Sequence, residues 1–343
     1  MVGLAIGLLA TIVIIQVMSV FDAQRRTTTG SADAQTNGGI ALYSIAREMQ
    51  MAGYPLLPVT DSALECTTLN VNGVAATSMD RITPVTITDG AAAMGVNPSD
   101  RITIRFGTTL MGGAATQITS LVGSDATVLS NLGCQVGDVT LITAGTTCAM
   151  STATALPTVA GTPPVYKVTL AHTTTAASGA NLGCVGAWNE ITYQVNQGTG
   201  NLDRISTVNG VASPATPSVV GVVNLQAQYG ISATANSNQV TQWVDASGLT
   251  WAAPTVANRN RIKAIRIAVV ARNAKVEPSD VATACSSTTA AAPAGLCAWA
   301  GSVASPAPAI DLSPGDANWA KYRYRVFETI IPLRNVIWSK DTL

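Results

Sequence analysis

The sequence predicts an α+β fold, in which one long N-terminal helix lies against a β-rich head. Three observations support this prediction: an uncharged run over residues 1–21, alternating strand patterns from residue 100 onward, and six widely spaced cysteines. Only 11% of the 343 residues are charged, against roughly 25% in typical soluble domains. The 19 basic and 19 acidic side chains balance, so the composition shows no electrostatic footprint for binding nucleic acid.

The N-terminal run reads MVGLAIGLLATIVIIQVMSVF, and the first charge after it is Asp22. A secretion signal fits poorly, because the apolar stretch is too long, its start carries no basic residue and no A-x-A site follows. About 20 helical residues at 1.5 Å each span roughly 30 Å, the thickness of the hydrocarbon core of a bilayer. We therefore predict that residues 1–21 lie in a membrane or in the core of a filament.

The helix is predicted to continue to residue 53, because no proline occurs before Pro55 and Gly53 provides a stop signal. Its second half, residues 22–53, is predicted to be amphipathic. One stripe at helical spacing is expected to pack on the head: Ile40, Tyr43 and Met49. Three glycines weaken the middle of the helix, at about 1 kcal/mol each relative to alanine: Gly30, Gly38 and Gly39.

Residues 54–343 are predicted to form the head. Six segments show the alternation of half-buried strands: 100–107, 165–171, 190–206 (a hairpin), 222–232, 261–276 and 322–338. Four segments rich in Gly, Ala, Ser, Thr and Pro are predicted to be surface loops: 107–135, 145–164, 206–218 and 279–318.

The six cysteines form no C-x-x-C motif, and the only histidine is His172, so a zinc site has no ligand set. An even number of cysteines behind an apolar segment favours disulfides made outside the cytoplasm over buried free thiols. Six cysteines allow 15 pairings. We expect the pairs that are close in sequence: Cys285–Cys297 and Cys134–Cys148, leaving Cys66 with Cys184.

The sequence carries no G-x-S-x-G, H-E-x-x-H, P-loop or G-x-G-x-x-G motif in a suitable context. We therefore predict no catalytic residue, no cofactor and no metal site. Two acidic loop stretches could supply oxygen ligands to calcium: Glu277 with Asp280, and Asp311 with Asp316. Neither has EF-hand spacing, and turn formation by aspartate is the favoured interpretation.

Gly3 and Gly7 form a G-x-x-x-G pattern, and Ala10 lies one turn further along the helix. Small residues at this spacing allow two helices to approach closely, although small residues also recur by chance in apolar helices. We predict that the helix packs against helices of other chains through these residues and three larger ones: Gly3, Gly7, Ala10, Ile14, Val17 and Phe21.

Four stretches of the chain carry a family resemblance. They are the N-terminal helix with its exit REMQMAGYP, the hairpin ITYQV…NLDRIS, the segment RIKAIRIAVVAR and the C-terminal YRYRVFETIIPLRNVIW. These stretches resemble type IV pilin-like proteins and, more narrowly, PilW-type minor pilins, whereas residues 57–185 match only in character. The resemblance implies a pilin-like fold, with a long protruding helix whose second half packs on an antiparallel sheet with long loops.

The resemblance also implies a structural subunit, and not an enzyme. We expect a minor pilin that primes assembly at or near the tip of a type IV pilus, with other minor pilins and a large tip adhesin as partners, and with roles in adhesion and twitching motility. It would lie in the bacterial inner membrane before assembly and in the extracellular pilus afterwards, with its head in the periplasm or outside the cell. Two alternatives of the same kind are a major subunit of a homopolymeric filament and a type II secretion pseudopilin. A membrane-anchored periplasmic enzyme is the alternative from another class.

Pilins of this kind begin with a short basic leader and a processed start of the type Phe-Thr-Leu-Ile-Glu-Leu. Neither precedes the apolar run here, so we expect the coding sequence to extend upstream of Met1.

Overall fold

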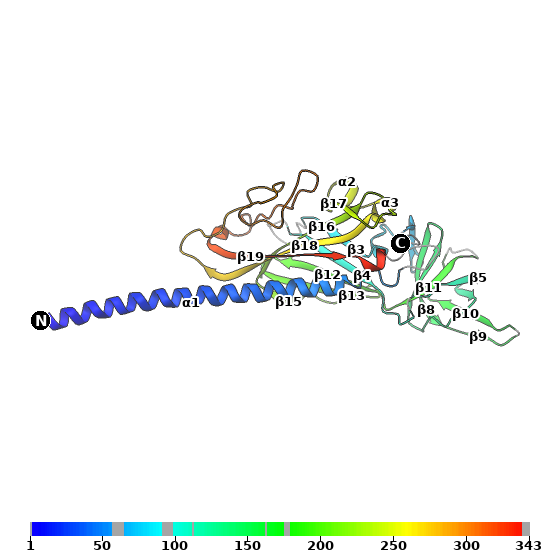
Figure 1. The fold of residues 1–343 in the computed structure, drawn as a ribbon. Helices are drawn as coiled ribbons and strands as arrows, with labels where there is room; N and C mark the ends of the chain where they lie inside the picture. Colours follow the sequence, from blue (N-terminus) through cyan, green and yellow to red (C-terminus); the bar gives the residue numbers. More distant parts are fainter. Residues whose placement is uncertain are drawn as a thin grey trace.

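The structure is a computed structural model. It describes residues 2–56, 65–90, 99–111, 113–161, 163–174 and 179–337, without the side chains of residues 2, 4, 5, 22, 23, 26 and 27. A long helix, α1 (Val2–Met49), extends from one end of a head that contains three β-sheets (Figure 1). Among its described residues, the head also contains these short helical elements: η2 (Asp80–Ile82), α2 (Gly248–Trp251), α3 (Val256–Arg259), η4 (Trp319–Lys321) and α4 (Arg334–Ile337).

The predicted fold class, an α+β pilin-like fold with one antiparallel sheet, is wrong. The chain is mostly β, with 40% strand and 20% helix, and its strands form several sheets. The division into residues 1–53 and residues 54–343 remains a prediction, because nothing in the structure tests whether the head folds without the helix.

The sheet nearest to α1 has four antiparallel strands in the order β17 (Val240–Val244), β16 (Val222–Ser232), β18 (Ile262–Val276) and β19 (Tyr322–Pro332). Every residue of β16 is buried, as are the first ten of β18. Both strands are therefore covered on both faces. Helix α1 covers one face, and the loop over residues 277–318 packs on the other through residues such as Leu296 and Ile310.

The second sheet lies behind the first and has the strand order β14-β13-β12-β4-β3, with β15 (Thr216–Val220) also paired to β13. Its members are β3 (Val85–Thr88), β4 (Arg101–Phe106), β12 (Asn189–Asn196), β13 (Asn201–Val208) and β14 (Val211–Ala212). Strands β12 and β13 form the predicted hairpin, paired in register from Asn189↔Val208 to Asn196↔Asn201. Side chains from this sheet, the first sheet and α1 form one continuous hydrophobic core.

The third sheet has nine strands and lies at the end of the molecule opposite to the start of α1 (Figure 1). It consists of β1 (Thr68–Val71), β2 (Val74–Ala75), β5 (Thr116–Val122), β6 (Asp125–Val128), β7 (Val139–Ala144), β8 (Thr147–Ala155), β9 (Thr158–Val159), β10 (Val165–Leu170) and β11 (Asn181–Gly186). Strands β1 and β8 run parallel, and the other pairs are antiparallel.

All six segments predicted as strands contain strands, but two of the predicted loops, 107–135 and 145–164, are wrong. They contain the whole of β5, β6, β8 and β9. The inward-facing positions of these strands include alanines, for example Ala126, Ala149 and Ala153, all of them buried. Alanine and threonine differ little in hydrophobicity, so the sequence shows only a weak alternation between buried and exposed positions. The strands in these segments were therefore not predicted. The loop over 206–218 is partly wrong, because it contains β14 and the start of β15, whereas 279–318 contains no strand.

Three disulfides are present, and only one has the expected pairing. Cys285 pairs with Cys297 as predicted, but Cys66 pairs with Cys148 and Cys134 with Cys184. The parallel register of β1 with β8 places Leu69 beside Cys148, which brings Cys66 close to that strand. The register of strands far apart in sequence therefore decides these pairs, and nearness in sequence does not.

Ser99 and Asp100 connect the first two sheets. The backbone N–H of Asp100 donates to the Leu225 carbonyl on β16 at 2.7 Å, and its carboxyl oxygens accept the N–H of Ala227 at 2.7 Å and that of Gly90 at 3.0 Å. Asp100 is 2% exposed, and this burial raises the pKa of its carboxyl from 3.8 to about 8. A buried carboxyl group therefore stays protonated in the folded protein at neutral pH.

We predict that the stability of the head falls as the pH rises from about 4 to about 8. The unfolded chain loses the Asp100 proton near pH 4 and the folded protein loses it near pH 8, so over this window the folded state binds the extra proton and is favoured at the acidic end. The contribution of this group to the slope is at most about 1.4 kcal/mol per pH unit. Urea unfolding at several pH values measures it. In Asp100→Asn the slope should flatten by this amount, and an unchanged slope would contradict the assignment.

Candidate subunit interface

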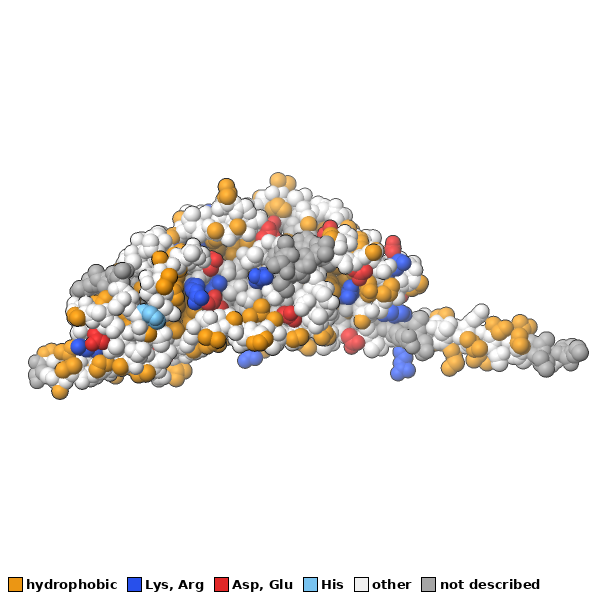
Figure 2. Space-filling model, turned by 180° about the vertical axis from the view of Figure 1, so that it is seen from behind, with side chains coloured by type: hydrophobic (Ala, Val, Ile, Leu, Met, Phe, Trp, Pro, Cys, Tyr) orange, Lys and Arg blue, Asp and Glu red, His pale blue; other side chains and the backbone are white. Residues whose placement is uncertain are grey.

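The first half of α1 is an uncharged rod that the head does not cover. From residue 2 to residue 21 the helix carries no charged side chain. Eleven large hydrophobic residues are between 44% and 67% exposed there: Ile6, Leu8, Leu9, Ile12, Val13, Ile14, Ile15, Val17, Met18, Val20 and Phe21. Hydrophobic side chains are visible on the part of the helix that protrudes from the head (Figure 2). Exposed apolar surface of this extent marks a site of interaction with other molecules.

The second half of α1 is fixed to the first sheet by small residues. Ala34, Ala41, Ile45 and Met49 are at most 3% exposed and recur at spacings of four or seven residues on one side of the helix. Gly38 lies between them, and a Cβ atom there would overlap the ring of Phe327 on β19. Gly30 likewise faces the side chain of Asn273 on β18. The glycines that weaken the helix on its own therefore allow it to lie directly on the sheet.

The predicted packing stripe is only partly the observed one. Met49 is buried in the core, but Ile40 is 49% exposed and Tyr43 is 68% exposed, so these two residues were wrongly assigned to the head contact. The buried side contains alanine and glycine at the positions nearest to the sheet, where larger side chains would hold the helix away from it. Large apolar residues alone therefore do not identify the side of the helix that faces the sheet.

An ion pair fixes the end of α1 to the second sheet. The Glu48 carboxylate accepts hydrogen bonds at 3.0 Å from Nε and at 2.8 Å from Nη2 of Arg204 on β13. Tyr193 on β12 is buried beside this pair, and burial, together with the Glu48 carboxylate, raises the pKa of its hydroxyl. The helix is thus fixed by packing along the first sheet and by a charged contact at its end, which sets the direction of the uncovered half.

The predicted helix-packing residues all lie in the uncovered half. Ile14, Val17 and Phe21 are 57%, 47% and 66% exposed, and the positions of Gly3 and Gly7 have open space beside them. Ala10 is also exposed. None of these residues has a partner in the described head, so their packing against other helices stays a prediction.

For the predicted membrane span over residues 1–21, the finding is negative. Within the described residues, no helix is both long enough and apolar enough to cross a membrane.

Three of the four acidic loop residues considered for calcium, all except Asp280, are engaged in other contacts. Glu277 accepts a hydrogen bond from Arg323 at 3.0 Å, and Asp316 pairs with Arg272 at 3.1 Å. Asp311 accepts from the backbone and hydroxyl of Ser313, as turn-forming aspartates do. In the part of the chain that the structure describes, no three His, Cys, Asp or Glu side chains come together as a metal site would require.

The fold and the uncovered helix define a class of protein: a disulfide-bonded β-rich head that presents one uncharged helix for contact with other molecules. Residues 192–335 match the family model described as Type IV Pilus-assembly protein W (PilW). The predicted PilW-type resemblance is therefore confirmed over this part of the chain. The match covers 144 of the 343 residues, so this part of the chain is similar to a family of type IV pilus assembly proteins.

Two further comparisons give no match. Neither a curated protein nor a solved structure matches the chain significantly. The matched region begins inside β12 and ends in α4, so it includes the whole first sheet and leaves out the nine-stranded sheet.

We predict opposite effects for alanine at two neighbouring glycines. Gly39→Ala places a methyl group in open space and should stabilise the protein by roughly 0.5–1 kcal/mol through helix propensity. Gly38→Ala should destabilise it by roughly 1–3 kcal/mol, because the methyl group overlaps the Phe327 ring. Thermal unfolding of the two variants in the same buffer measures both effects. Shifts of the same sign would contradict the observed docking of α1.

Proposed function

We propose that this protein is a minor pilin-type subunit that primes the assembly of a type IV pilus and lies at or near its tip. The observation that carries the proposal is the uncovered half of α1, with its eleven exposed hydrophobic residues and no charge. Such a surface is stable only against lipid or other apolar helices. Its function is therefore packing, and assembly buries it.

The tip position is supported by the shape of the molecule. The nine-stranded sheet lies beyond the end of α1, opposite to the uncovered half (Figure 1). A subunit inside a fibre must leave room for the next subunit at the end that carries the nine-stranded sheet. The subunit at the tip has no next subunit and needs no such room. The nine-stranded sheet beyond the end of α1 is therefore better accommodated at the tip of the fibre than along its shaft.

In this proposal the protein is held at the inner membrane before assembly, with its head on the periplasmic side. The apolar segment exchanges lipid for the helices of other subunits, so its side chains are desolvated in both states. The other minor pilins and a large tip adhesin are the proposed partners. The disulfides support the location of the head, because they form and persist in oxidising compartments.

Complementation of a deletion strain tests the proposal. Deletion should reduce surface pili and twitching motility, and the wild-type gene should restore them. The Ile14→Asp variant should restore at least about tenfold fewer surface pili than the wild-type gene does. The reason is that a charge in an apolar helix contact costs roughly 2.5–3.5 kcal/mol. Leu132→Asp is the matched control, since Leu132 is 81% exposed on the nine-stranded sheet side of the head.

Protein levels must be equal in the two complemented strains, as measured by immunoblotting. Normal piliation and motility in the deletion strain would contradict the proposal. Loss of protein secretion with normal pili would indicate the pseudopilin alternative instead.

The position in the fibre is tested by labelling. Val303 is 89% exposed in the loop over 277–318, so Val303→Cys accepts a maleimide-linked gold label without disturbing the core. We expect sparse label concentrated at one end of the fibre. Label along its whole length would show a major subunit and overturn the proposed tip position.

A further inference from the structure

The outer edge of the first sheet is open along β19. This strand is the last in its sheet and pairs only with β18, from Ala264↔Pro332 to Val276↔Tyr322. It is 11 residues long. Within the described residues, no backbone hydrogen bond joins positions 323–331 to a segment other than β18. The N–H and C=O groups on the free side of this strand are therefore available to another strand.

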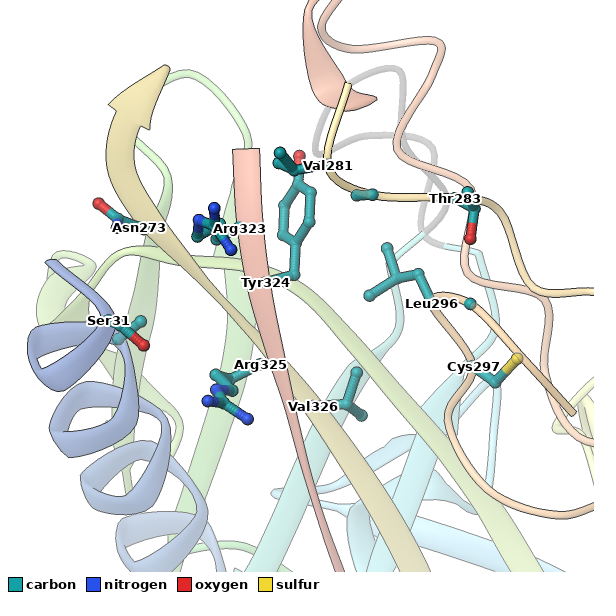
Figure 3. Close-up of a pocket in the computed structure, with 13 residues that line it drawn as sticks. Ser31, Asn273, Val281, Thr283, Leu296, Cys297, Arg323, Tyr324, Arg325 and Val326 are labelled. Carbon is teal, nitrogen blue, oxygen red and sulfur yellow. The ribbon is translucent and has the colours of Figure 1, made fainter. Parts of the chain in front are cut away.

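A groove of about 500 Å³ follows this edge at residues 323–326. Ser31 and Ala34 of α1 form one wall. The loop over residues 277–318, which contains the disulfide Cys285–Cys297, forms the other with Val281, Leu296 and Cys297. Figure 3 shows the groove from the side of β19, with the helix and the loop on opposite sides of the strand. The free strand edge thus lies between two walls and is not a flat surface.

The two sides of the groove differ in chemistry. Arg323 and Arg325 point toward the side of α1, whereas Tyr324 and Val326 lie on the side of the loop, where the Tyr324 ring ends beside Val281 (Figure 3). Arg323 pairs with Glu277 at 3.0 Å. Arg325 is exposed and forms no ion pair with a described residue. One side is therefore basic and the other apolar.

We propose that this groove binds an extended peptide segment of a partner protein by adding it as a fifth strand to the first sheet. Main-chain hydrogen bonds to β19 hold the segment, and its alternate side chains enter the two sides of the groove. The segment that fits alternates acidic residues, facing Arg325, with apolar residues, facing Leu296 and Val326. This partner surface is separate from the apolar half of α1 and does not depend on the function proposed above.

A synthetic peptide of sequence TVEVEVT tests the proposal on the full chain in detergent micelles, by fluorescence anisotropy. Its scrambled form VVTEETV has the same composition without the alternation, and TVKVKVT has the opposite charge. We expect saturable binding of TVEVEVT that is at least about tenfold tighter than binding of either control. Equal binding of the alternating and scrambled peptides would overturn the proposal.

Arg325→Glu separates binding in the groove from binding elsewhere. It should weaken the binding of TVEVEVT at least about tenfold and strengthen that of TVKVKVT, because the sign of the basic side is reversed. Arg47→Glu is the control, since Arg47 is exposed on α1 and does not line the groove. An unchanged affinity in Arg325→Glu, or an equal loss in both variants, would overturn the proposal.

Hydrogen exchange measured by mass spectrometry locates the contact. The bound peptide should slow the exchange of amides in residues 323–326 and leave β17, at the other edge of the same sheet, unchanged. Protection confined to other segments would show that the peptide does not bind as an added strand.

Discussion

The docking of α1 on the first sheet is the contact on which the rest of the arrangement depends. The helix approaches β18 and β19 closely because Gly30 and Gly38 have no side chain that would hold it away. Each glycine costs about 1 kcal/mol of helix propensity, and the burial of Ile45 and Met49 in the core offsets this cost. Since the second half of the helix is fixed and the helix is continuous over 48 residues, the first half must extend beyond the head. Its exposure is a consequence of rigid docking, and no local feature of residues 6–21 is needed to explain it.

The opposite face of the same sheet is closed without any regular secondary structure. The loop over 277–318 places Leu296 and Ile310 on the apolar face. Arg266 on β18 lies between Trp243 and Trp299, with its guanidinium 4.8 Å and 4.2 Å from the ring centroids. This cationic contact, together with the hydrogen bond from Gln228 to Pro306 at 2.8 Å, holds the loop at its centre. The disulfide Cys285–Cys297 closes a segment that has little apolar surface of its own, where a covalent link stabilises most.

The sequence predicted the elements that obey strong periodicity and failed where side chains are small. Strands such as β4 and β18 carry Ile and Val, so their alternation or continuous apolar character is evident. The nine-stranded sheet buries Ala126 and Ala153 instead. Alanine in the sequence does not distinguish a buried strand position from a position in a loop. The same limit applies to the interface: the apolar run over residues 1–21 was evident, whereas the docking side of α1 was assigned to Ile40 and Tyr43. Pairings that depend on distant strands, such as Cys66–Cys148, follow from register and could not be read from spacing.

The region that matches the family model, residues 192–335, contains the sheet on which α1 docks and ends just beyond β19. That sheet has one face covered by the helix, the other covered by the loop, and one edge strand, β17, whose residue Trp243 lies against the loop at Ser305. Among the described residues, the backbone edge of β19 is thus left open by a fold that closes both faces of the sheet. Because the uncovered half of α1 and the start of β19 lie at the same end of the molecule (Figure 1), a partner that packs on the helix passes close to the open edge. The first contact is apolar and accepts any uncharged helix, whereas a strand edge between a basic and an apolar wall discriminates among sequences. If both proposed contacts form, the sheet edge supplies the selectivity between partners, and the helix supplies most of the free energy of association.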